Sequence, residues 1–106
     1  MNYELRIHPA VWDDLRQISE YITNEFNAPH IAARITSKIL ARMRQLVTMP
    51  ECGRLHMTTP SIQVRSVRAA KYNIVFSIDK KRRLVKILLV VHARRNLAKL
   101  LKSRDE

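Results

Sequence analysis

The stretch YNIVFSIDKKRRLVKILLVV, residues 72–91, decides the fold of this 106-residue chain. Apolar residues alternate through its first part, which is the two-residue period of a half-buried strand. The charged residues 79–82 predict a turn, and the strand that follows is apolar on both faces, as is typical of a central strand. The apolar positions are Tyr72, Ile74, Phe76 and Ile78 in the first strand, Val85, Ile87, Leu89 and Val91 on one face of the second, and Leu88 and Val90 on its other face.

The residues that precede this pair of strands extend the pattern. Ile62–Arg68 predicts another strand, so that the last third of the chain forms a β-meander. Upstream, Pro50, the single glycine Gly53 and Pro60 indicate an irregular crossing from Thr48 to Ser61. The meander is therefore expected to be reached through a segment without regular structure.

The amino-terminal part begins with a short strand and a helix. Residues 1–7 alternate between polar and apolar, which predicts a half-buried strand. Pro9 suits the start of a helix, and an apolar stripe runs from about Ala10 to Phe26. Asp13 and Asp14 are expected in the first turn of this helix, where the helix dipole favours negative charge.

A second helix follows after a break at residues 27–30. Because the break is short, the two helices should form an antiparallel hairpin. The element order is then β-α-α-β-β-β, which predicts an α+β fold with the helical hairpin packed on one face of a small, largely antiparallel sheet. The opposite sheet face should stay partly open. The apolar stripe of the second helix consists of Ile31, Ile35, Ile39, Met43, Leu46 and Val47.

Length and composition suit one compact domain over residues 1–106. Cys52 is the only cysteine, so no intramolecular disulfide is possible and a reducing cytoplasm is the expected location. No run approaches the roughly 18 apolar residues of a membrane span, and we expect no membrane partner. Residues 97–106 are expected to form a short helix or a mobile tail that partner binding orders.

Positive charge is concentrated in the carboxyl-terminal part of the chain. Residues 1–60 contain seven Lys and Arg against six Asp and Glu, whereas residues 61–106 contain thirteen against three. These counts leave +1 in the first segment and +10 in the second, in agreement with the net charge of +11. Such asymmetry predicts an electropositive region and an anionic partner, which is a nucleic acid, an acidic enzyme surface or an acidic neutralising protein.

Two groups of basic residues flank the predicted meander. The first group lies on or near its first strand, and the second follows its last strand. If they converge, the surface suits binding of a phosphodiester and stabilisation of charge during its cleavage, with His92 as general acid or base. The alternative, which periodicity alone favours, is a solvated basic face whose histidine ends a strand. The groups are Arg65, Arg68 and Lys71, and then His92, Arg94 and Arg95.

Other residue patterns point to no further chemistry. The four histidines are scattered without ligand spacing, so we expect no metal and no cofactor. Cys52 near His56 suits a thiol nucleophile, but a loop cysteine without a supporting constellation is more often incidental. The basic run at residues 80–83 suits either a nucleic-acid patch or a solvated hairpin turn, and we favour the turn.

The ordered pattern resembles the RelE/ParE superfamily of type II toxins, and its ParE branch more closely. The helix that contains Asp14-Leu15 is similar to the "DL..I..YI" helix of ParE-type toxins, and residues 29–32 resemble the "P..A" start of their second helix. Residues 46–54 resemble the "L...P..GR" turn. Arg65 with residues 72–76 resembles the "R......Y.I.Y" meander, and residues 91–96 resemble the "V.H.RRD" ending.

The resemblance implies a toxin that a cognate antitoxin neutralises in a hetero-oligomer. RelE-like members of the superfamily are ribosome-dependent mRNA endoribonucleases, whereas ParE-like members share the fold but inhibit DNA gyrase. Ribonuclease members commonly carry an arginine directly after the meander tyrosine, and here that residue is Asn73. This difference favours the ParE branch.

Three hypotheses follow. The first is a gyrase-directed toxin whose target-binding residues are Arg65, Arg68, Lys71, Arg94 and Arg95. The second is a metal-independent endoribonuclease that acts on mRNA at the ribosome, with phosphate held by three arginines and His92 in proton transfer. The third is an inactive member that retains only antitoxin binding. The three arginines of the ribonuclease hypothesis are Arg65, Arg68 and Arg94.

Overall fold

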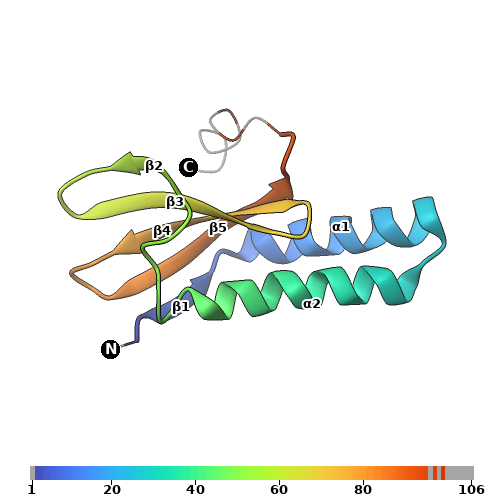
Figure 1. Ribbon diagram of the computed structural model, residues 1–106, viewed down its shortest axis with the longest axis horizontal. Helices are drawn as coiled ribbons and strands as arrows, with labels where there is room; N and C mark the ends of the chain where they lie inside the picture. Colours follow the sequence, from blue (N-terminus) through green and yellow to red (C-terminus); the bar gives the residue numbers. More distant parts are fainter. Residues whose placement is uncertain (1, 96, 98, 100–106) are drawn as a thin grey trace.

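A five-stranded sheet carries two helices on one of its faces in the computed structural model, which describes residues 2–95, 97 and 99 (Figure 1). The strand order is β1-β5-β4-β3-β2, in which β1 runs parallel to β5 and the other neighbours are antiparallel. This arrangement confirms the predicted α+β fold. The elements are β1 (Glu4–Ile7), α1 (Pro9–Phe26), α2 (Pro29–Gln45), β2 (Arg54–Thr58), β3 (Ile62–Ala69), β4 (Tyr72–Asp79) and β5 (Leu84–His92).

Both helices begin with a proline, whose fixed φ suits the first helical position. The side chain of His8 accepts a hydrogen bond from the Ala10 amide and caps α1. Asn27 adopts the left-handed conformation and ends α1. The break between the helices is therefore shorter than predicted, because α2 already begins at Pro29. Among the described residues, neither helix is long and apolar enough to cross a membrane.

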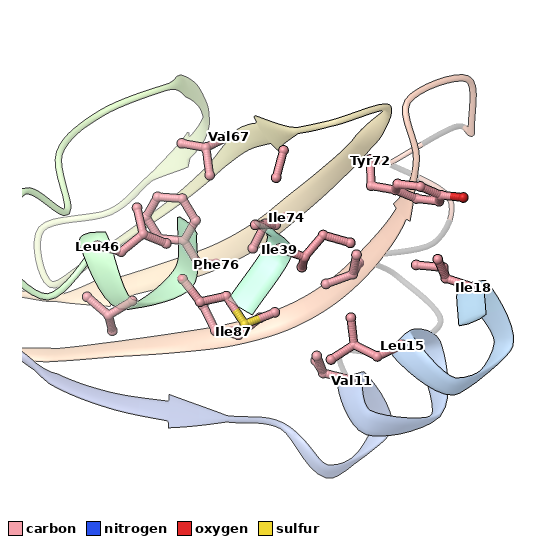
Figure 2. Close-up of a cluster of buried hydrophobic side chains, with 14 of the residues drawn as sticks. Val11, Leu15, Ile18, Ile39, Leu46, Val67, Tyr72, Ile74, Phe76 and Ile87 are labelled. Carbon is pink, nitrogen blue, oxygen red and sulfur yellow. The ribbon is translucent and has the colours of Figure 1, made fainter. Parts of the chain in front are cut away.

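The core lies between the helical hairpin and the sheet (Figure 2). Phe76, Ile74 and Ile87 from the central strands are fully buried against Ile39 and Leu46. Burial of each such side chain stabilises the fold by about 1.5–3 kcal/mol. The hairpin face is not buried along its whole length, since Ile31, which was predicted in the apolar stripe, is 39% exposed.

Strand β5 contains a β-bulge that breaks the predicted alternation. Val75 pairs with Leu89 and Phe76 with Ile87, so Leu88 has no direct partner in β4. Val90 consequently joins Ile87 in the core under the helices, whereas Leu88 and Leu89 pack on the opposite side of the sheet. The prediction that Leu89 shares a face with Ile87 was therefore wrong, because one extra residue reverses the side-chain direction.

Strand β2 lies inside the segment predicted to be irregular, and that prediction was wrong for residues 54–58. The strand pairs with β3 from Arg54, opposite Ser66, to Thr58, opposite Gln63. Gly53 enters the strand with φ +74°, and a Cβ at this position would lie 2.1 Å from the Ser66 carbonyl oxygen. Glycine is required here because no side chain fits between the two strands.

A side chain of α1 completes the backbone hydrogen bonding of β5. Strand β1 ends at Ile7, opposite Ile87, so it does not reach the last part of β5. Beyond that point the Val90 amide donates to Asp14 Oδ2 at 3.0 Å. The expected placement of Asp13 and Asp14 in the first helical turn was wrong, because α1 begins at Pro9 and that turn has no acidic residue. The Asp14 carboxylate anchors the helix to the sheet.

The turn between β3 and β4 consists of Ala70 and Lys71. Ala70 has φ +54° and Lys71 has no positive φ. A hairpin loop of two residues with positive φ only at its first position favours glycine there. Ala70 therefore holds an unfavourable backbone conformation directly beside Lys71.

We expect Asp14→Ala to lower the free energy of unfolding by about 1–3 kcal/mol, because the half-buried Val90 amide then lacks an acceptor. Denaturant titration measures the change. The matched variant is Asp13→Ala, which removes an exposed carboxylate that pairs with the exposed Arg16 at 3.4 Å. Equal losses in the two variants would contradict the anchoring role of Asp14.

Gly53→Ala and Ala70→Gly should have opposite effects on stability. We expect the first to destabilise the fold by at least about 2 kcal/mol, since it combines positive φ with a backbone clash. The second should stabilise it by about 0.5–1 kcal/mol, because relief of the left-handed conformation exceeds the entropy cost of glycine. Thermal unfolding of both variants checks the signs, and changes in the same direction would refute this account.

Candidate functional site

Four exposed basic residues gather at one end of the sheet, where β3 turns into β4 and β5 ends. A hydrogen bond of 2.9 Å from the Ala93 amide to the Lys71 carbonyl joins the β3–β4 turn to the segment that follows β5. The sequence analysis placed these residues in two separate groups, and the structure brings them together. We call them the basic end: Arg68, Lys71, Arg94 and Arg95.

Arg68 points to the sheet face opposite the helices, which we call the open face. Its neighbours in the strand, Val67 and Ala69, belong to the core under the helices, so Arg68 between them lies on the other side. Opposite Arg68, β4 presents Asn73, the residue that directly follows Tyr72. The pair of opposed residues on the open face therefore consists of one cation, Arg68, and one uncharged residue, Asn73.

Arg65 does not belong to the basic end. It pairs with Phe76 and thus lies on the helix side of the sheet, opposite to Arg68. Its side chain donates to Gln63 Oε1 at 2.8 Å and to the Gly53 carbonyl at 3.4 Å. These contacts connect Gly53, the residue before β2, to β3, which supports a structural role for Arg65.

His92 also lies on the helix side of the sheet. It pairs with Tyr72 in β4, and the two rings meet edge to face with centroids 5.6 Å apart. Its Nδ1 atom accepts a hydrogen bond from the Arg94 amide at 3.2 Å. The four residues predicted for catalysis are therefore divided between two faces, with Arg65 and His92 on one side and Arg68 on the other.

Tyr72 closes the core at this end of the sheet. Figure 2 shows its ring close to Ile18 of α1, with the hydroxyl directed away from the labelled apolar side chains. Burial raises the pKa of the Tyr72 hydroxyl above its usual value, and the nearby Tyr21 adds to the shift. Tyr72 is therefore a neutral hydrogen-bonding group at physiological pH.

The basic run at residues 80–83 occupies the β4–β5 turn and not the basic end. Lys80 pairs with Glu51 at 3.0 Å, and Asp79 accepts a hydrogen bond from the Arg82 amide. These contacts are typical of an exposed turn, as the sequence analysis favoured. Among the described residues, no group of three or more His, Cys, Asp or Glu side chains is arranged to hold a metal ion.

Comparison with known proteins identifies the family. A family profile described as "ParE toxin of type II toxin-antitoxin system, parDE" matches residues 5–97. The chain belongs to the ParE toxin family. A search of curated protein sequences gave no significant match.

Solved structures of both RelE and ParE toxins resemble the fold of this ParE-family toxin. An archaeal RelE from a RelE–RelB complex of Pyrococcus horikoshii OT3 has a TM-score of 0.68 at 20% identity, covering 91% of this chain and 100% of that one. A mutant of the E. coli toxin RelE in the free state has a TM-score of 0.63 at 14% identity, covering 98% and 94%. A chain of the chromosomal ParDE system of P. aeruginosa has a TM-score of 0.65 at 14% identity, covering 85% and 95%.

The sequence analysis missed one polar pair of the toxin, on the open face. His56 of β2 and Ser66 of β3 form a hydrogen bond of 2.7 Å between Nε2 and Oγ. His56 and Cys52 are not joined by a hydrogen bond among the described contacts. The Cys52 sulfur instead accepts a hydrogen bond from the Arg42 guanidinium, with 3.8 Å between Nη2 and Sγ. The alternation of polar and apolar residues in RLHMT, residues 54–58, is the signal that would have revealed the strand.

His56 should make the stability of the toxin depend on pH. Burial lowers the pKa of His56 below its usual value, and the Arg54 guanidinium adds to the shift. The unfolded chain therefore binds more protons as the pH falls, so the contribution is present above about pH 6.5 and is lost as the pH falls through the folded-state pKa.

We expect His56→Gln to flatten this loss of stability on acidification. Denaturant titrations at several pH values compare it with the wild type, and His30→Gln, an exposed site on α2, reports the effect of removing a histidine as such. An unchanged pH profile in His56→Gln would refute the assignment.

Proposed function

We propose that this toxin inhibits DNA gyrase by binding, and that a cognate antitoxin neutralises it. The observation that supports binding over RNA cleavage is the division of the predicted nuclease residues between the two sheet faces, with His92 held beside Tyr72 and away from Arg68. Proton transfer and phosphate binding at one phosphodiester require groups within hydrogen-bond reach of the same atoms. The match to the ParE profile supports the same choice.

The basic end is the proposed target-binding surface. Its four cations are exposed, and no acidic side chain pairs with any of them in the part of the chain that the structure describes. Unpaired cations at one end of a molecule attract an anionic surface over several ångströms and increase the association rate. The proposed contact is with gyrase or with the DNA that gyrase holds.

The antitoxin is proposed to cover the helical hairpin and to meet the basic sheet with acidic residues. Large apolar side chains on the hairpin are exposed, among them Trp12 at 53%, Tyr21 at 57% and Phe26 at 66%. Exposed aromatic residues of this kind are common anchors in protein interfaces. The similar solved structures include a RelE–RelB complex and a ParDE system, which supports a partner of this class.

An mRNA endoribonuclease is the second candidate. It is supported by the similarity of the fold to RelE toxins and by the presence of Arg68 and Arg94 at the same end of the sheet. An inactive member that only binds antitoxin is the third. Growth arrest after induced expression separates this last candidate from the other two.

Purified toxin is expected to inhibit supercoiling by DNA gyrase, or to trap its cleaved DNA, and the antitoxin is expected to reverse the effect. The triple variant Lys71→Gln/Arg94→Gln/Arg95→Gln should need at least about tenfold more protein for the same inhibition, because it removes charged contacts. The matched control is Arg34→Gln/Lys38→Gln/Arg44→Gln, which removes three exposed charges from α2.

Two outcomes would overturn the gyrase proposal. One is intact supercoiling at saturating toxin in a preparation that arrests growth on expression. The other is cleavage of mRNA on translating ribosomes, mapped by sequencing the new 5′ ends, with gyrase unaffected. The second outcome would establish the ribonuclease candidate, and His92→Ala would then test the predicted proton transfer.

A further inference from the structure

A second polar cluster lies on the open face, where β2 pairs with β3. Arg54 and His56 come from β2, and Ser66 and Arg68 come from β3. We call these four residues the β2–β3 cluster. Only Arg68 belongs also to the basic end, so the cluster extends the positive surface from the end of the sheet toward its edge.

The strand register places the two arginines of the cluster on either side of Ser66. Arg54 lies directly opposite Ser66 across the strand pair, and Arg68 follows Ser66 by two residues on the same face. Directly opposed Cβ atoms are about 4.5–5.5 Å apart, and diagonal ones about 7–8 Å. Two arginines at these positions can both place their guanidinium groups on one small anion near the Ser66 hydroxyl.

A β-bulge in β2 accompanies the contact between His56 and Ser66. Leu55 pairs with Arg65 and Met57 with Val64, so His56 is the extra residue of the bulge. Its ring is half-buried and lies 2.7 Å from the hydroxyl of Ser66, which is only 6% exposed. Bulges often direct a side chain toward a functional site.

The hydrogen bond between His56 and Ser66 has two possible directions. A neutral ring whose proton is on Nδ1 accepts the hydroxyl proton at Nε2, whereas a ring that carries a proton on Nε2, as the protonated ring always does, donates to Oγ. In the second state the Ser66 hydroxyl hydrogen is free to point at a ligand. Protonation of His56 thus fixes the state in which the Ser66 hydroxyl hydrogen is available to a ligand.

The charge of the cluster is not compensated by an acidic side chain of the described residues. Within the described residues, neither Arg54 nor Arg68 has an ion pair or a side-chain hydrogen bond. The charged group that acts on His56 from its own strand is Arg54. From β3 the open face adds Arg68, which stands opposite the uncharged Asn73 of β4. An anionic ligand would supply the missing negative charge.

We propose that the β2–β3 cluster binds a phosphate group of a nucleic-acid backbone, held by Arg54, Arg68 and the Ser66 hydroxyl, while His56 takes up a proton. Two guanidinium forks and a hydroxyl suit an anion with several acceptor oxygens. Beyond Arg68 the surface continues with Lys71 of the basic end. A row of cations suits the regularly spaced phosphates of a polynucleotide better than a single carboxylate. The site shares Arg68 with the proposed target-binding surface, but its test does not require gyrase to be the target.

Binding of a short oligothymidylate, measured by fluorescence anisotropy without gyrase, tests this site. Arg54→Gln/Arg68→Gln should weaken binding by at least about tenfold and reduce the slope of log affinity against log salt by about 0.7 for each lost phosphate contact. The matched control is Arg34→Gln/Lys38→Gln, with the same loss of charge on α2. Thermal unfolding verifies that both variants fold.

The coupling to His56 is tested by pH. Because the bound phosphate stabilises the protonated ring, affinity should rise as the pH falls from about 8 to about 6, and His56→Gln and Ser66→Ala should each reduce this rise. Titration of the wild type by NMR provides a measurement without a variant, in which oligothymidylate should move the His56 ring signals and raise the pKa of His56.

Three results would overturn the proposal. The first is an equal loss of affinity in the α2 control, which would indicate a general effect of charge. The second is an unperturbed His56 signal at saturating oligothymidylate. The third is that Arg54 and Arg68 are required for the binding of poly-glutamate but not for the binding of the oligonucleotide. This result would assign the cluster to an acidic protein partner.

Discussion

The bulge at Leu88 in β5 is the constraint on which the arrangement of the toxin depends. Strand β5 is apolar on both faces and lies between β1 and β4, so its apolar side chains must pack on one side of the sheet or the other. One extra residue reverses the direction of every side chain that follows. Val90 thereby enters the core, and His92 is directed to the helix side, where it meets Tyr72.

This reversal separates the histidine at the end of β5 from the arginine of the open face. The polar part of the open face and the basic end contain cations without acidic partners among the described residues. Strand β2 adds His56 to this surface. Such a surface is suited to hold anions. It supports the proposal of a toxin that acts by binding, and the absence of a charged residue at Asn73 agrees with this interpretation.

Most of the fold could be predicted because its signals are local. The helices bury residues with helical spacing, such as Val11 and Leu15, and β4 alternates as strands do. Strand β2 was missed because Pro50, Gly53 and Pro60 dominate its surroundings, and only its pairing with β3 shows that residues 54–58 are extended. The tail expected at residues 97–106 lies, apart from Leu97 and Lys99, outside the described residues.

The sequence by itself determined the order of every element except β2, the charge asymmetry and the family, because periodicity, composition and ordered motifs do not depend on which elements meet. Only the tertiary structure decided which basic residues share a surface. Arg65 and Arg68 differ by three positions and so face opposite ways in a strand, whereas Lys71 and Arg94, distant in sequence, lie at one end of the sheet. Register and bulges set these positions, and both depend on long-range backbone pairing that no local pattern encodes.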